Sequence, residues 1–240
     1  MDMTDIQSQM ASLGMEMGEE DQIKSSDVDK IVREAMASVK ADKKVPKEKG
    51  DVEVVHFDEG KSILQEGMKS IRLAVDSDGK GLLGNAALHY DTALIKFAKA
   101  LENGVPTSEE ARKKLVASME GYMDRVQLIL LASPVTSFGD VSSQVTTNTS
   151  VAYSDINKSR PQVLAAMNKN GFSCVSRAVQ LRKKGKESED TWTSFVLYSE
   201  AIDCFVTYMK NDAKGGSNES VKKAVFELLD TAESLKQKLS

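Results

Sequence analysis

Residues 86–101 read AALHYDTALIKFAKAL, and residues 194–209 read SFVLYSEAIDCFVTYM. Both stretches follow one pattern: a small residue, then Tyr, Ala, Phe and a large apolar residue at successive spacings of 4, 3, 4 and 4. These spacings place the five side chains on one face of an α-helix, where we expect them to form a core. A helix that occurs twice with the same aromatic residues in register predicts a duplicated helical module.

The composition of the whole chain favours a soluble helical protein. Of the 240 residues, 40% are hydrophobic and 28% are charged, as in ordinary globular domains, and only 4 are proline. No run approaches the roughly 18 apolar residues that a membrane-spanning helix needs. The acidic, polar N-terminus does not have the character of a secretory signal. We therefore expect an all-α cytoplasmic protein with no direct membrane insertion.

The charge and the cysteines exclude several kinds of site. The net charge is −4, and residues 1–58 are the most acidic part of the chain. No part is basic enough to predict nucleic-acid binding or adhesion to anionic lipid. Cys174 and Cys204 are the only cysteines and are too far apart for a CxxC motif, so we expect free thiols. With only His56 and His89 elsewhere, no zinc site is predicted.

Apolar stripes and glycine-containing turns divide the chain into four parts. Residues 1–58 are charged and poor in aromatic residues, which predicts a mostly disordered segment. Residues 59–132 and 160–240 each carry apolar stripes at helical spacing, so each is expected to form a three-helix antiparallel bundle with its own core. Residues 133–159 are rich in Ser and Thr and are expected to be a linker.

The two predicted bundles resemble the MIT domain, the module of microtubule-interacting and trafficking proteins. In the first bundle the resemblance is carried by residues 86–97 and by residues 122–126, which read YMDRV. In the second it is carried by residues 194–205 and by residues 228–233, which read LLDTAE. TPR-like helical hairpins share part of this spacing, but two copies in the same order strengthen the match to MIT.

This resemblance implies a function in protein binding. MIT domains bind short C-terminal motifs of ESCRT-III subunits, either as an amphipathic helix between the second and third helices or as an extended segment between the first and third. We therefore expect a non-enzymatic adaptor in endosomal trafficking or membrane remodelling, recruited peripherally to membranes through its protein partners. Two modules on one chain would raise the effective concentration of the second binding event.

A second apolar seam runs along the predicted third helix of the first bundle. It consists of Val116, Met123 and Leu130, which are seven residues apart and lie beside the core stripe. A three-helix bundle has no internal use for a second seam. The seam is therefore a candidate groove for a partner, although packing against the other bundle or the linker would also explain it.

The resemblance also implies an anchor and a charge in each groove. The helix-binding groove of MIT domains has a Leu in the third helix and an acidic residue one turn later, which pairs with a basic residue of the ligand. Leu229 and Glu233 match this pattern in the second bundle, whereas the first has Met123 and Gln127. A hydrogen bond to a charged group is about twice as strong as one between neutral groups. We therefore expect the second bundle to bind a helical motif better.

Enzyme signatures are missing from the sequence. There is no GxxxxGK[ST] phosphate loop, no kinase signature and no Cys-His-Asn arrangement of a calpain-like protease. We expect neither an enzyme nor a cofactor. Two alternatives stay open: a regulatory fragment or subunit of a kinase or protease with tandem MIT modules, and a TPR-like scaffold that binds peptides.

Overall fold

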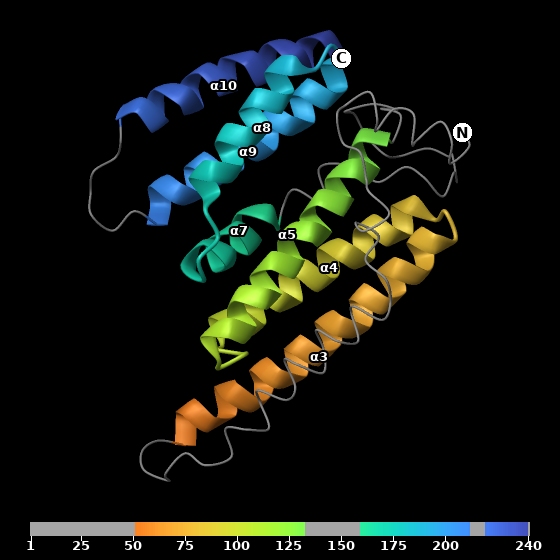
Figure 1. Cartoon of the computed structure of the whole chain (residues 1–240), viewed down its shortest axis with the longest axis vertical. Helices are drawn as coiled ribbons and strands as arrows, with labels where there is room; N and C mark the ends of the chain where they lie inside the picture. The colour runs from red at the N-terminus through yellow and green to blue at the C-terminus, as the bar shows by residue number, and fades with distance from the viewer. Residues whose placement is uncertain (1–50, 133–158, 212–218, 240) are drawn as a thin grey trace.

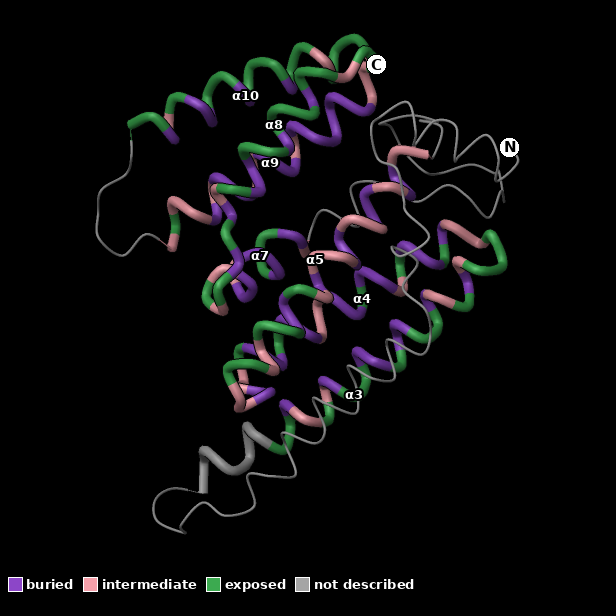
Figure 2. Tube along the Cα trace, viewed as in Figure 1, coloured by how far each residue is buried: buried purple, intermediate pink, exposed green. Residues whose placement is uncertain are grey.

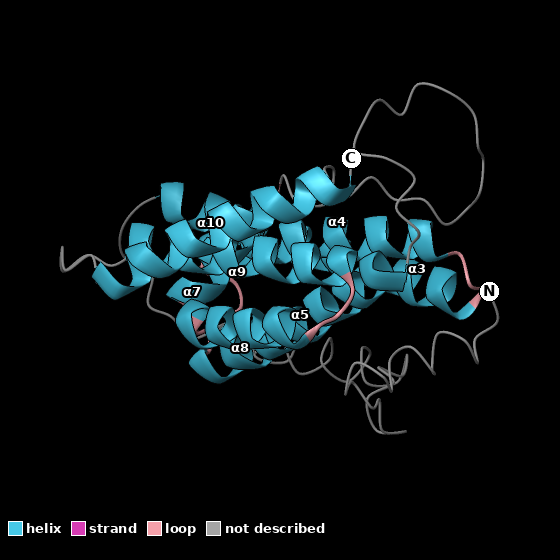
Figure 3. Ribbon diagram, turned by 90° about the horizontal axis from the view of Figure 1, so that it is seen from above, coloured by secondary structure: helices cyan, strands magenta, loops and turns pink. Residues whose placement is uncertain are grey.

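The computed structural model describes residues 51–132, 159–211 and 219–239 (Figure 1). The expectations for residues 1–50 and for the linker at residues 133–158 lie outside these ranges. Within them, every element is an α-helix, which confirms the all-α prediction (Figure 3). None of the described helices is both long enough and apolar enough to cross a membrane.

The first half of the molecule contains three helices. They are α3 (Asp51–Gly79), α4 (Leu83–Glu102) and α5 (Glu109–Ala132). Helix α3 begins before the boundary predicted at residue 59 and continues to Gly79. Glycines with positive φ angles, Gly81 at 72° and Gly104 at 73°, then allow the tight turns that precede α4 and α5.

The second half contains four described helices, where the sequence predicted three. They are α7 (Arg160–Lys169), α8 (Cys174–Glu187), α9 (Thr191–Asn211) and α10 (Glu219–Leu239). The apolar stripe at the start of this half is divided because the chain turns at Gly171, whose φ is 97°. The Ser173 side chain then caps α8 by accepting a hydrogen bond from the backbone N–H of Ser176.

The short helix α7 joins the two halves. It packs against both α4 and α9, which are the two copies of the duplicated helix (Figure 1). One continuous hydrophobic core consequently runs from Leu64 in α3 to Leu228 in α10. The expectation of two bundles with separate cores is therefore replaced by two helical halves that share one core.

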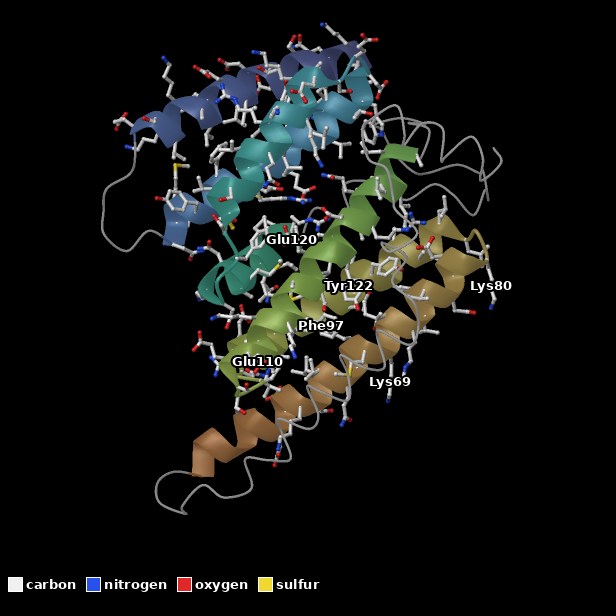
Figure 4. All side chains as sticks on the ribbon, viewed as in Figure 1. Lys69, Lys80, Phe97, Glu110, Glu120 and Tyr122 are labelled. Carbon is white, nitrogen blue, oxygen red and sulfur yellow. The ribbon has the colours of Figure 1, made fainter. Side chains whose placement is uncertain are left out.

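The aromatic residues of the duplicated helix are buried, as predicted. In the first half, the rings of Phe97 and Tyr122 face each other between α4 and α5, with their centroids 6.3 Å apart (Figure 4). Gly67 of α3 lies against Phe97, because a Cβ added there would come within 2.6 Å of the ring. In the second half, Gly185 of α8 lies against the ring of Tyr198 in the same way, at 2.7 Å. In each half, a glycine within a helix therefore leaves space for an aromatic ring of the duplicated helix.

Candidate functional site

Helix α10 carries one apolar face toward the core and a second face toward solvent. Its buried residues are Val221, Ala224, Val225, Leu228 and Ala232. On one flank, Glu227 accepts a hydrogen bond from Arg182 of α8 at 2.8 Å, which connects that flank to α8. Figure 2 shows exposed residues along the side of α10 that faces away from the rest of the molecule.

Two large apolar side chains on α10 are exposed. Phe226 is 67% exposed and Leu229 is 39% exposed. Glu233, four residues after Leu229, is exposed as well. Spacings of three and four residues place these side chains in one row along the helix, which we call the α10 stripe. Because Leu229 is two residues from Glu227, it lies on nearly the opposite flank, away from α8.

The α10 stripe differs from the other exposed apolar residues of the described chain. Leu73, Leu88 and Val179 are the other large apolar side chains that are exposed, and each is alone on its helix. Single exposed apolar residues are ordinary on protein surfaces, whereas neighbouring ones form an apolar patch that a partner can cover. Phe226 was missed by the sequence analysis, although its position three residues before Leu229 was a signal that could have identified it.

The four predicted site residues of the first half are buried. Val116, Met123, Gln127 and Leu130 all lie in α5, and Met123 is 0% exposed. The side-chain amide of Gln127 donates a hydrogen bond to Glu200 of α9 at 2.5 Å. The indole N–H of Trp192, also in α9, donates to the backbone carbonyl of Leu130 at 3.0 Å.

The seam of α5 is therefore buried, and α5 contacts the second half at Gln127 and Leu130. This is the alternative that the sequence analysis left open, and it means that the seam is not exposed to a ligand helix. Of the six predicted site residues, only Leu229 and Glu233 face solvent. No pattern in the sequence indicated the contact between Gln127 and Glu200, because the two residues are 73 positions apart and belong to different halves.

No cluster of three or more His, Cys, Asp or Glu side chains in the described ranges could hold a metal ion. Comparisons of the chain with models of protein families, with curated proteins and with solved structures gave no match. The basis for a functional conclusion is therefore the α10 stripe together with the resemblance seen in the sequence.

Proposed function

We propose that this protein is a non-enzymatic adaptor that binds an amphipathic C-terminal helix of an ESCRT-III-type subunit on the α10 stripe. The observation that carries the proposal is the exposure of Phe226 and Leu229 beside Glu233 on one flank of α10. An amphipathic helix is the ligand that suits a row of apolar anchors at helical spacing. The adaptor acts in the cytoplasm and reaches endosomal membranes through its partners.

The apolar anchors supply most of the affinity in this proposal. Fully burying a Phe or Leu side chain contributes about 1.5–3 kcal/mol, so covering the exposed part of Phe226 contributes about 1–2 kcal/mol. A basic residue of the ligand opposite Glu233 adds about 0–1 kcal/mol, because an ion pair at the rim of an interface stays partly hydrated. Phe226 and Leu229 anchor the ligand, and Glu233 selects its orientation and charge.

Only the second half exposes a candidate site for a helical ligand in the described structure. The α5 residues that correspond to Leu229 and Glu233 are Met123 and Gln127; both are buried, and Gln127 is hydrogen-bonded to Glu200 of α9. One chain in this conformation therefore offers one stripe for a helical ligand. We expect a stoichiometry of one helical tail per chain.

Titration of fluorescently labelled C-terminal helical peptides of ESCRT-III subunits against the full chain tests the proposal. Leu229→Asp and Phe226→Asp should each weaken binding at least tenfold, because the ligand would have to desolvate the new carboxylate. Glu233→Lys should weaken binding about fivefold or less. The matched control is Val179→Asp, because Val179 is an exposed apolar residue of α8 outside the stripe.

Two results would count against the proposal. If no ESCRT-III tail binds the unmodified chain, the proposed ligand is wrong. If a tail binds but both α10 substitutions leave its affinity at the level of Val179→Asp, the site lies elsewhere on the molecule. Circular dichroism of each variant confirms that a loss of binding is not a loss of fold.

A further inference from the structure

The N-terminal sequence contains an apolar row that the proposed function does not use. Its five large side chains are spaced by three, four, three and four residues: Met3, Ile6, Met10, Leu13 and Met17. We call these five residues the N-terminal row, because their spacing is that of one helix face. The first 17 residues also contain five of the 11 methionines of the chain. The flexible Met side chain adjusts to the shape of a partner, so this composition suits a binding segment.

The α10 stripe has a similar repeat and a cation at each end. Lys222 lies four residues before Phe226, and Lys236 lies three residues after Glu233, so the spacings from one lysine to the other are four, three, four and three. Lys236 is exposed. The amine of Lys222 donates to Glu219 at 3.1 Å, in an exposed pair of the kind that contributes little to stability. Both amines are therefore accessible to an acidic partner.

The two rows have the same order of spacings when the helices run antiparallel. From its C-terminal end, the N-terminal row also follows four, three, four and three. Two helices whose apolar rows repeat every 3.5 residues can pack along their whole length. In this register Leu13 lies opposite Phe226, and Met10 lies opposite Leu229. The segment would thus cover both exposed apolar side chains of α10.

The charges at the two ends are complementary in the same register. Residues 1–20 contain no Lys or Arg and have five acidic residues: Asp2, Asp5, Glu16, Glu19 and Glu20. Glu16 lies beside Lys222, and Asp2 lies beside Lys236. The two carboxylates are 14 residues apart and so are the two lysines, which corresponds to about 21 Å along a helix. Opposite charges at both ends favour this register over others.

The chain between the segment and α3 is long enough for this contact. Helix α3 begins at Asp51, and Figure 1 shows that its start and α10 lie toward opposite ends of the described molecule. Residues 18–50 span up to about 110 Å when extended, at about 3.3 Å per residue. The longest described helix, α3 with 29 residues, is about 44 Å long. The connection can therefore reach α10 from the start of α3.

We propose that residues 3–17 form a helix that covers the α10 stripe of the same chain and is displaced when an ESCRT-III-type helix binds there. The inference rests on the proposed function, because it takes the stripe as the ligand site, and it adds the regulation of that site. Ordering the segment costs conformational entropy, which keeps the contact weak. Glu233 lies opposite Ile6, within an acidic segment, but pairs favourably with a basic residue of a ligand. A basic ligand helix therefore displaces the segment.

Zero-length cross-linking of the full chain with a carbodiimide tests the contact without any ligand. It should join Glu16 to Lys222 and Asp2 to Lys236 within the monomer, as identified by mass spectrometry. Replacing both central anchors, Met10→Ser with Leu13→Ser, should lower the yield of both cross-links by about threefold or more, because the apolar contact with α10 is lost. The matched control is Ala11→Ser, which lies outside the row.

Two outcomes of the cross-linking overturn the inference. If neither cross-link forms in the monomer, the segment does not cover the stripe. If the cross-links occur only in dimers, the segment covers the stripe of a second copy instead of its own.

Titration of a labelled ESCRT-III tail measures the regulatory effect. The variant with Met10→Ser and Leu13→Ser should bind the tail about twofold more tightly or better, because apparent affinity falls with the fraction of chains whose stripe is covered. Ala11→Ser should bind like wild type. Equal affinities of the double variant and wild type overturn the inference. If no tail binds either protein, the proposed function fails, and the cross-links alone decide whether the segment covers the stripe.

Discussion

The structure and the sequence-based interpretation of α5 predict different effects for a substitution of Met123. If the α5 seam were an open groove, truncating Met123 would affect a ligand and leave stability almost unchanged. In the structure Met123 is 0% exposed and belongs to the shared core, so Met123→Ala removes buried methylene groups and leaves a cavity. Substitutions of this kind cost about 2–5 kcal/mol.

The matched variant is Phe226→Ala in α10. Phe226 is 67% exposed, so its truncation should change the free energy of unfolding by about 0.5 kcal/mol or less. For a protein of this size, 1 kcal/mol corresponds to roughly 2–4 °C in melting temperature. Met123→Ala should therefore lower the melting temperature by about 4–20 °C, and Phe226→Ala by about 2 °C or less.

Thermal unfolding followed by circular dichroism, together with guanidinium titration, measures both variants under the same conditions. If Met123→Ala melts within about 2 °C of wild type, Met123 is not buried in the core in solution. In that case the α5 seam would again be a candidate for partner binding.

Two further predictions concern the duplicated helix and the glycines packed against it. Phe97→Ala and Phe205→Ala should each lower the free energy of unfolding by about 3–5 kcal/mol, because both rings are buried in the shared core. A loss below about 1 kcal/mol in guanidinium titration would contradict the burial of these rings. Gly67→Ala should destabilise the protein by about 1–3 kcal/mol, because the new methyl group would meet the ring of Phe97. Gly79→Ala is the control and should be neutral or slightly stabilising, because no atom lies within 4 Å of its new methyl group. Equal melting temperatures for the two variants would contradict the contact between Gly67 and Phe97.

The local structure was largely predictable because it depends on neighbours in sequence. The repeated spacing of Tyr90 with Phe97 and of Tyr198 with Phe205 correctly predicted two amphipathic helices with buried aromatic faces. The interruption at Gly171 was also visible in the sequence. Its consequence, a separate helix α7 that joins the halves, was missed because a turn signal locates the end of a helix but not the direction in which the next one packs.

The candidate site was predicted only in part, because the sequence does not show which helix covers which face. Helical spacing identified Leu229 as lying off the core stripe, and the structure leaves it exposed with Glu233. The same reasoning applied to Val116, Met123 and Leu130 identified a second seam in α5 but could not identify what covers it. The α5 seam is buried, and α5 contacts α9 through Gln127 and Leu130, whereas Leu229 on α10 stays exposed.

The amino-acid sequence by itself determined the helices of the repeat, their buried aromatic faces and the apolar seam of α5, because these follow from side-chain periodicity within a single helix. Only the tertiary structure decided that the two halves share one core and that the α5 seam is closed while the α10 stripe is open. It also placed Arg177 between Asp124 of the first half and Glu200 of the second. Each of these outcomes depends on contacts between residues distant in sequence, and the periodicity of one helix contains no information about which other helix will cover its face.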